Sequence, residues 1–249
     1  MTEGRWSVES SPPAFGGSDE IHVWRAALDS TLPDLERLYS ELPNDERAAA
    51  DRFHFESDRR RYVVAHATFR RLIAGYIAPG ELPRYSASFA RGPNGKPALA
   101  ANRLRFNLAH AGGLALFAFA LDREVGVDLE VVDATVEVEA IARNFFAAPE
   151  QSALLALPPS LRVAGFYHIW TQKEAYLKAR GDGVAHGLDH FDVEAVPDRP
   201  ARLLADRRDP LAAARWKLFT LEPGPGLRGA LGVEGAEPVT IRCFECLTA

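Results

Sequence analysis

Residues 166–183 have the sequence FYHIWTQKEAYLKARGDG, which predicts a helix followed by a glycine turn. Apolar side chains recur at spacings of three and four from Phe166 through Trp170 to Leu177, the period of a helix with one buried face. Gly181 is expected to end this helix, because glycine adopts the left-handed conformation at little cost. We expect the helix to begin near Leu161 and to organise the rest of the chain.

Two charged residues on this helix allow a structural and a functional interpretation. Trp170, Glu174 and Lys178 are four residues apart and therefore project from one side. Taken alone, a Glu–Lys pair at this spacing is usually a solvated salt bridge that adds only about 0.2–0.5 kcal/mol. A second acidic stretch upstream strengthens the functional interpretation.

That stretch is VGVDLEVV, which starts at Val125 and predicts a strand. Alternation along a strand places Asp128 and Glu130 on one face, and Val127 and Leu129 on the other. Ionised carboxylates are costly to bury unless a cation or hydrogen-bond donors meet them. The alternative is a strand edge that faces water.

Several cationic residues are candidates for binding an anion. Arg59, Arg60 and Arg61 lie in the predicted first turn of a helix, where positive charge opposes the helix dipole. They are either solvated or placed for an anionic partner. Lys96 stands between Gly95 and Pro97, and this constrained backbone suits a phosphate contact.

The composition predicts a soluble, globular chain. Its 249 residues are enough for one large domain or two of moderate size, with 47% hydrophobic and 25% charged residues. A net charge of −5 argues against a broad nucleic-acid surface. There is no apolar run of about 18 residues and no signal-peptide pattern. We expect a cytoplasmic protein without membrane or nucleic-acid partners.

The two cysteines, Cys243 and Cys246, form a C-x-x-C motif near the C-terminus. A structural zinc site usually needs four ligands, and the sequence offers no second pair. The redox form of this motif normally opens a helix after a strand. We therefore interpret both cysteines as small apolar residues of a last strand.

The remaining pattern predicts an α+β fold with a division near residues 121–124, giving halves 1–122 and 123–249. Residues 1–20 are rich in Ser, Pro and Gly and are expected to be irregular. The predicted elements of the first half are a strand at 21–24, a helix from Pro33 to Leu42, a polar helix within 43–55, a long helix capped by Asp58, and strands at 85–89, 104–108 and 114–121. His110 is placed between the last two strands. Those of the second half are the strand from Val125, helices at 136–147 and 149–157, the helix from Leu161, and strands near 191–196, 215–221, 227–233 and 239–244.

If the strand from Val125 meets the helix from Leu161, Asp128, Glu130 and Glu174 form an all-oxygen cluster. Such a cluster suits Mg²⁺, which typically binds one or two carboxylates together with substrate phosphates. The cationic or donor groups suited to those phosphates are Arg61, Lys96, His110 and Lys178. The residues thus predict a magnesium site for a phosphorylated ligand without specifying which ligand.

These segments resemble the Sfp-type 4′-phosphopantetheinyl transferases. The matching stretches, in the family's order, are a weaker one over 52–61, then Gly95-Lys96-Pro97, 106–110, 126–130 and 170–183, and the resemblance spans roughly residues 40–195. It implies two similar α/β halves related by a pseudo-twofold axis. The active site would lie in the cleft between them, with the coenzyme A nucleotide bound by the first half and the catalytic helix in the second.

The resemblance also implies an enzyme of the holo-carrier-protein synthase type. It would transfer the 4′-phosphopantetheine arm of coenzyme A to a serine of an acyl or peptidyl carrier protein, with Mg²⁺, and release adenosine 3′,5′-bisphosphate. By position, Asp128, Glu130 and Glu174 would bind Mg²⁺, while Glu174 and Lys178 would be catalytic, Glu174 accepting the serine proton. The residues implied for coenzyme A are Arg47, Arg61, Lys96, His110, Lys173 and Lys178. A monomer is expected; polyketide or nonribosomal-peptide biosynthesis is a candidate role, which the sequence does not distinguish from fatty-acid or siderophore biosynthesis.

The sequence departs from the family at several positions. Ala109 and Ala111 flank His110 where serines are frequent, and Asp182 stands where a lysine can sit. Glu46 and Ala49 occupy a region where some members have two lysines, with Arg47 as the candidate substitute. Two alternatives stay open. One is a degenerate coenzyme A- or carrier-binding module, supported only by the two alanines, and the other is a magnesium-dependent nucleotide or pyrophosphate hydrolase, which nothing in the sequence favours.

Overall fold

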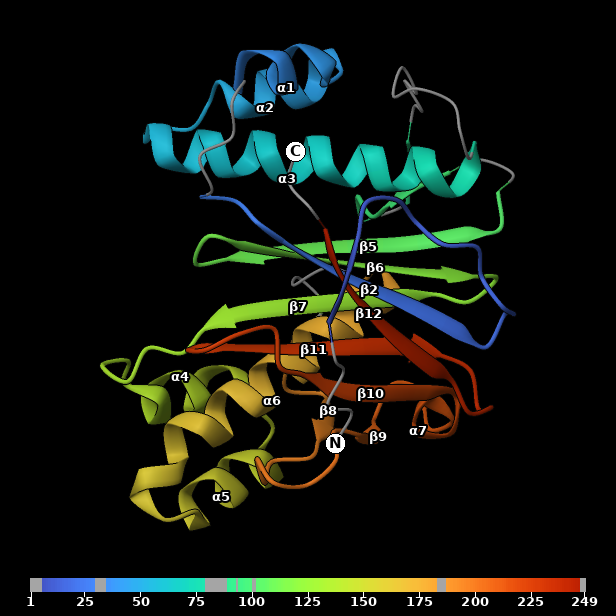
Figure 1. The fold of residues 1–249 in the computed structure, drawn as a ribbon. Helices are drawn as coiled ribbons and strands as arrows, with labels where there is room; N and C mark the ends of the chain where they lie inside the picture. Colours follow the sequence, from blue (N-terminus) through green and yellow to red (C-terminus); the bar gives the residue numbers. More distant parts are fainter. Residues whose placement is uncertain are drawn as a thin grey trace.

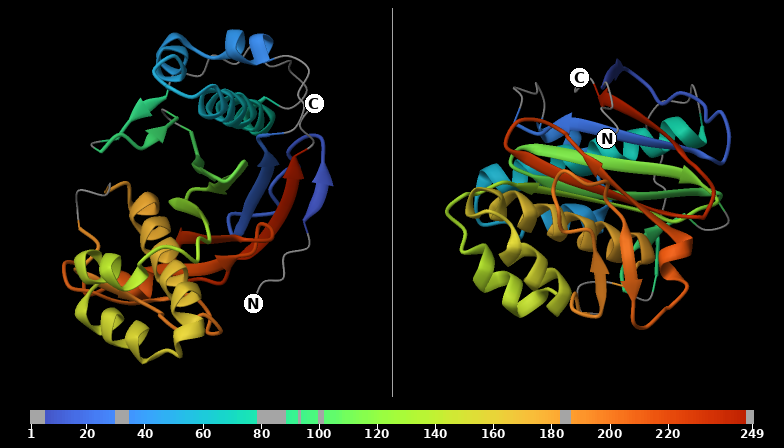
Figure 2. Two further views of the ribbon diagram at one scale, coloured as in Figure 1. Left: turned by 90° about the vertical axis from the view of Figure 1, so that its left-hand side faces the viewer. Right: turned by 90° about the horizontal axis from the view of Figure 1, so that it is seen from below.

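The computed structural model describes residues 6–29, 35–78, 89–92, 94–99, 102–182 and 187–246. It has a mixed α+β architecture in which two sheets are stacked between two long helices, α3 (Glu56–Ile77) and α6 (Pro159–Arg180) (Figure 1). The two helices lie on opposite sides of the stacked strands (Figure 2). None of the described helices is both long enough and apolar enough to cross a membrane.

The first sheet has five strands in the order β1-β12-β2-β6-β5. Its members are β1 (Ser7–Glu9), β12 (Thr240–Cys246), β2 (Glu20–Ala27), β6 (Leu114–Leu121) and β5 (Leu104–Ala111). α3 covers its outer face, where Phe69 packs against Phe106, Phe117 and Phe119. Two short helices, α1 (Leu35–Glu41) and α2 (Asn44–Ala50), pack on α3.

The second sheet has three antiparallel strands in the order β10-β11-β7. They are β10 (Trp216–Leu221), β11 (Leu227–Glu234) and β7 (Val125–Val131). α6 covers the outer face, and the inner faces of both sheets enclose one apolar cluster that includes Val23, Leu116, Val127 and Leu231. The smaller elements of this part are α4 (Val138–Phe145), α5 (Ala148–Ala156), α7 (Ala212–Arg215) and the hairpin of β8 (Phe191–Val193) and β9 (Leu203–Asp206). A two-residue pairing of β3 (Ala90–Arg91) with β4 (Pro97–Ala98) completes the described strands.

Two glycines allow α6 to approach its sheet closely. A Cβ atom at Gly126 would lie 2.2 Å from Ala179 N and 2.3 Å from Ala175 O, so only glycine fits there. At Gly232 on the neighbouring strand a Cβ atom would lie 3.0 Å from Ala175 O. Gly126, Asp128 and Glu130 share one face of β7 because side chains alternate along a strand. The contact at Gly126 therefore shows that both carboxylates are on the α6 side.

The structure confirms the main predicted elements and corrects others. Gly181 ends α6 with φ of 73°, as predicted. Within the predicted irregular segment, Ser7–Glu9 form β1 because they pair in parallel with β12. Asp58 does not cap α3: the helix already begins at Glu56, and Asp58 lies in its first turn beside Arg61. β5 runs on to Ala111, so that His110 is part of this strand.

Other elements were missed or cannot be compared. The pattern gives no indication of β9 or α7, whose segments are short. Pro33 and residues 85–88 of the predicted strand fall outside the described residues. Both cysteines lie in the last strand, as predicted, and that strand pairs with β2 rather than with the elements just before it in the chain. The division into 1–122 and 123–249 stays a prediction.

Candidate active site

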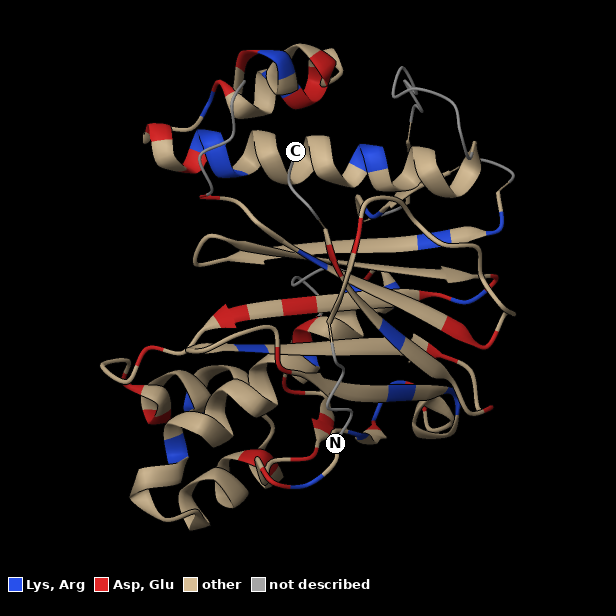
Figure 3. Cartoon of the chain, in the orientation of Figure 1, with Lys and Arg blue, Asp and Glu red and all other residues tan. Residues whose placement is uncertain are grey.

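β7 and α6 bring four of the predicted site residues together. The acidic residues of β7 lie beside α6 (Figure 3). Lys178 Nζ on α6 donates a hydrogen bond to Asp128 Oδ1 at 2.6 Å, and Trp170 Nε1 donates to Glu130 Oε1 at 3.1 Å. Glu174 lies one turn from both helix residues and is close enough to interact electrostatically with Asp128 and Glu130. We call Asp128, Glu130 and Glu174 the acidic cluster.

The acidic cluster concentrates negative charge in a poorly solvated space. Asp128 is buried, and no hydrogen-bond donor among the described residues reaches its Oδ2 atom. Burial and repulsion by Asp128 raise the pKa of Glu174 and of Glu130 above the ordinary value, although Lys178 opposes the shift of both. A carboxylate with a raised pKa in a site of this kind is suited to accept a proton.

Residues of the first half of the chain form a cavity of about 130 Å³. Two further predicted site residues, Arg61 and His110, line it. Arg61 comes from the second turn of α3, since the helix begins at Glu56 and not after Asp58 as predicted, and His110 comes from the end of β5. The cavity is also lined by Leu28, Phe53, Asp58, Ala111, Gly112 and Gly113. We call it the His110 cavity.

The charges of the His110 cavity are partly balanced. The Arg61 guanidinium donates to both carboxylate oxygens of Asp29, at 2.8 and 2.7 Å. Loss of water around the imidazole, with repulsion from His66, Lys178 and Arg61, lowers the pKa of His110 below its ordinary value. His110 is therefore expected to be a neutral hydrogen-bonding group at pH 7 when no anion is bound.

The cavity and the acidic cluster are neighbours. Lys178, which holds Asp128, is close enough to influence the charge state of His110. The turn after β5 touches the end of β7, since a Cβ atom at Gly112 would lie 2.5 Å from Val131 Cγ2. A ligand could therefore span both places, with one part in the cavity and another beside Lys178.

Comparison with known proteins agrees with this arrangement. Residues 26–121 match a family model described as 4′-phosphopantetheinyl transferase, N-terminal, and residues 124–231 match one for the 4′-phosphopantetheinyl transferase superfamily. The chain is also 37% identical, over 224 residues, to 4′-phosphopantetheinyl transferase HetI of Nostoc sp., which covers 88% of this chain and 89% of HetI.

The chain belongs to the 4′-phosphopantetheinyl transferase superfamily.

Other members of the superfamily show the same likeness over most of their length. The identity to 4′-phosphopantetheinyl transferase psf-1 of Bacillus pumilus is 34% over 186 residues, covering 74% of this chain and 77% of psf-1. For Sfp of Bacillus subtilis it is 28% over 191 residues, covering 76% and 81% of the two chains. This chain is accordingly a transferase of the phosphopantetheinyl class.

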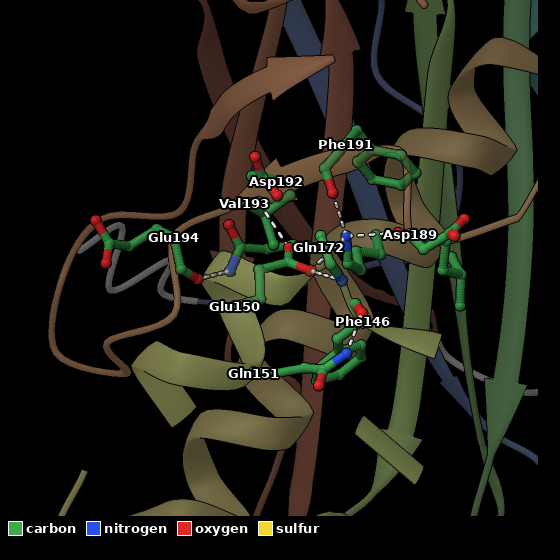
Figure 4. A network of polar contacts seen from close by, with 12 residues as sticks. Phe146, Glu150, Gln151, Gln172, Asp189, Phe191, Asp192, Val193 and Glu194 are labelled. Atoms are coloured by element: carbon green, nitrogen blue, oxygen red, sulfur yellow. Dashed lines mark hydrogen bonds and ion pairs between the residues drawn. The ribbon is translucent and has the colours of Figure 1, made fainter. Parts of the chain in front are cut away.

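Lys173, which was predicted to contact coenzyme A, lies in a different place in this phosphopantetheinyl transferase. Its side chain is fully buried, and Nζ contacts Glu150 Oε2 at 2.8 Å, Leu188 O at 2.8 Å and Phe191 O at 2.5 Å. Glu150 also accepts hydrogen bonds from the backbone N–H groups of Ala147 and Val193 (Figure 4). The prediction for Lys173 is therefore corrected: adjacent helix residues point about 100° apart, so Lys173 faces the α5 and β8 core while Glu174 faces the acidic cluster.

Arg47 and Lys96 also lie outside the lining of the His110 cavity. The Arg47 guanidinium donates to Asn44 Oδ1 within α2, and its contact with coenzyme A stays a prediction. Glu46 is buried and accepts two hydrogen bonds from Arg70. Lys96 contacts the end of α6 and the start of β7.

Three residues that contribute to the site were not predicted. Asn107 Oδ1 accepts a hydrogen bond from Val127 N at 2.9 Å and so joins β5 to β7 across the junction of the two sheets. Its polar side chain between Phe106 and Leu108 was the available signal. Phe53, which lines the cavity, lies in the stretch 52–61 that resembles the family, whereas Asp29, the partner of Arg61, had no distinguishing pattern.

Proposed function

We propose that this enzyme transfers the 4′-phosphopantetheine arm of coenzyme A to a serine hydroxyl of an acyl or peptidyl carrier protein. The observation that carries the proposal is the position of Lys178 between the acidic cluster and the His110 cavity. The pyrophosphate of coenzyme A lies between the nucleotide and the pantetheine arm, and a cation at this point can bind it. Membership of the superfamily supports this choice of substrate.

The His110 cavity is the proposed place for the nucleotide end of coenzyme A. Arg61 and His110 would bind phosphate oxygens, and the half-exposed ring of Phe53 offers an apolar surface beside them. Asp29 already binds Arg61, so phosphate would share or displace an existing carboxylate contact. We propose that the active site lies between the two halves of the chain. The same hypothesis includes a pseudo-twofold axis that relates the two halves.

In the proposed reaction, the serine oxygen forms a bond to the phosphorus that carries the pantetheine arm. The bond between that phosphorus and the bridging pyrophosphate oxygen breaks, and adenosine 3′,5′-bisphosphate leaves with this oxygen. The serine proton goes to Glu174, directly or through water. The raised pKa of Glu174 favours this role because a carboxylate of higher pKa is a stronger base.

The acidic cluster fits a divalent cation that is shared with a bound ligand. Asp128 Oδ2 is buried without a donor among the described residues, and only Lys178 forms an ion pair with Asp128. Among the described residues, no three His, Cys, Asp or Glu side chains are arranged so that they could hold a metal ion by themselves, so oxygen atoms of the ligand would have to supply part of the site. Asp128, Glu130 and Glu174 would hold Mg²⁺ together with phosphate oxygens, as this ion commonly binds. When bound, Mg²⁺ would neutralise charge on the pyrophosphate.

Mass spectrometry of apo-carrier proteins tests the proposal. Acyl and peptidyl carriers are incubated with the enzyme, coenzyme A and Mg²⁺, and the added phosphopantetheine is scored. Glu174→Gln should lower the rate by about 100-fold or more while the fold survives, because positioned proton acceptors contribute this much. Glu237→Gln, at an exposed position, is the matched control.

Chelation with EDTA should stop the reaction, and added Mg²⁺ should restore it. Binding of coenzyme A without modification of any carrier would instead indicate a degenerate binding module. Release of adenosine 3′,5′-bisphosphate in the absence of a carrier would indicate a hydrolase. The predicted monomer is checked by light scattering in the same preparation.

A further inference from the structure

Lys96 joins the first part of the chain to the end of α6. Its Nζ atom donates to Ala179 O at 2.6 Å, to Val125 O at 3.0 Å and to Glu124 Oε2 at 2.7 Å. A lysine ammonium has three N–H donors, so these acceptors use all of them. Only 15% of the side chain is exposed. No donor of Lys96 is left for a phosphate in this arrangement.

Two of the three acceptors are backbone carbonyl groups, one on β7 and one at the end of α6. The last carbonyl groups of an α-helix have no hydrogen-bond donor within the helix, and a cation near them is favoured by the helix dipole. Ala179 O is one of these groups. Asn94, two residues before Lys96, donates a hydrogen bond from Nδ2 to Gly181 O, just after the end of α6, at 3.0 Å. The segment that contains Asn94 and Lys96 therefore caps α6 from the side.

The capped end of α6 sets the geometry of the acidic cluster. α6 touches β7 at Gly126, where a Cβ atom would lie 2.2 Å from Ala179 N. Lys178 directly precedes Ala179, and Asp128 follows Gly126 by two residues, so the 2.6 Å contact between them depends on this junction. Lys96 holds both sides of it, through Ala179 O on α6 and Val125 O on β7.

We propose that Lys96 is a positioning residue that fixes the end of α6 against the start of β7, and that it does not bind a phosphate of coenzyme A. Glu124 balances its charge and is itself held by Arg105 at 3.0 Å. The role concerns the structure of the ligand-free enzyme. It rests on the proposed function only where its effect on turnover is considered.

Hydrogen–deuterium exchange of the ligand-free enzyme is the primary test. Lys96→Met should speed exchange at residues 177–182 by about tenfold or more, because the last turn of α6 would open locally. Lys217→Met, on β10, removes one positive charge elsewhere and should leave this segment unchanged. If Lys96→Met does not fold, Asn94→Ala removes the neighbouring contact to Gly181 O and should raise exchange in the same segment to a smaller extent.

Ligand binding and turnover complete the test. The affinity of Lys96→Met for adenosine 3′,5′-bisphosphate should stay close to that of the wild type, whereas a lost charge-assisted phosphate contact would weaken it about tenfold or more. The kcat of transfer should fall about tenfold or more at saturating coenzyme A, since small displacements of catalytic groups are costly. Unchanged exchange together with tenfold weaker binding would overturn the proposal. A wild-type enzyme without transfer activity would count against the proposed function, while the exchange result would still decide the role of Lys96.

Discussion

The helices α3 and α6 are both 22 residues long and each covers one sheet, yet buried ion pairs attach them to their neighbours in different ways. α3 is joined to α2 by Arg70, which binds Glu46 through two hydrogen bonds at 2.7 and 2.9 Å. α6 is joined to α5 by Lys173, whose single ammonium contacts Glu150 and two backbone carbonyls. Both pairs are shielded from water: the side chains of Arg70 and Glu46 are 11% and 9% exposed, and those of Lys173 and Glu150 are 0% and 2% exposed.

The pKa values of the two carboxylates are shifted in opposite directions. Burial opposes ionisation of Glu46, but the contacts with His66 and Arg70 prevail and lower its pKa to about 2. For Glu150, burial prevails over Lys173 and raises the pKa, and burial also lowers the pKa of Lys173. The comparison shows that the α3 pair is favourable as a charged pair, whereas the α6 pair is maintained by the complete set of contacts around it.

The largest effect is expected from Lys173→Met. This change leaves the Glu150 carboxylate buried without its cation and should lower the free energy of unfolding by about 3–5 kcal/mol. Urea denaturation followed by tryptophan fluorescence measures it. The double variant Glu150→Gln, Lys173→Met is the matched control and should recover part of the loss. If Lys173→Met were as stable as the wild type, the ion pair between α6 and α5 would not be needed for stability, and the proposed difference between the two pairs would be wrong.

Glu46→Gln should destabilise the protein less, by about 1.5–3 kcal/mol, because it weakens charge-assisted hydrogen bonds but leaves a side chain that can still bond to Arg70. The depressed pKa of Glu46 gives stability that is present above the ordinary pKa of 4.5 and is lost as the pH falls toward about 2. Unfolding measured between pH 6 and pH 2 should therefore be less acid-sensitive in the variant. An identical acid dependence in both proteins would mean that this pair does not govern the stability of the α3 side.

Gly126→Ala tests how closely α6 must lie on its sheet. The added methyl group would meet the α6 backbone, which cannot yield as a side chain can, and a loss of about 1–3 kcal/mol is expected. Transfer activity should fall as well, because Lys178 would move away from Asp128. Gly232→Ala is the graded comparison, since its Cβ atom would lie 3.0 Å from Ala175 O and should cost less. Equal stability of Gly126→Ala and the wild type would contradict the close contact.

The smallest effect is expected from Trp170→Phe, which keeps an aromatic ring beside Phe166 but removes the donor to Glu130. The hydrogen bond from Trp170 lowers the pKa of Glu130 against burial, so its loss should raise this pKa further. The acid side of the pH–rate profile should then move to higher pH, and transfer near pH 6 should fall about three- to tenfold. The profile of Phe166→Leu provides the control, because that change alters packing and leaves the donor in place.

Local patterns predicted the elements that build the acidic cluster. Helical spacing and Gly181 defined α6, and alternation along β7 placed Asp128 and Glu130 on one face. The helical period that unites Trp170, Glu174 and Lys178 also indicates that Lys173 points elsewhere, although family resemblance suggested a role at the ligand. The position of Lys96 could not be predicted, because its partners include backbone carbonyls that any residue could supply. Asp58 shows the limit of capping patterns, since acidic side chains suit the first turn as well as the cap.

The position of β12 in the first sheet determines when this sheet can fold during synthesis of the chain. β12 lies between β1 and β2, so the first sheet cannot be completed until residues 240–246 have left the ribosome (Figure 2). A truncated product that stops at residue 122 would expose one edge of β2 and leave β1 without its partner. Expression of the first half as an independent fragment should therefore yield insoluble material, and supplying residues 240–246 in trans becomes the natural means of rescue.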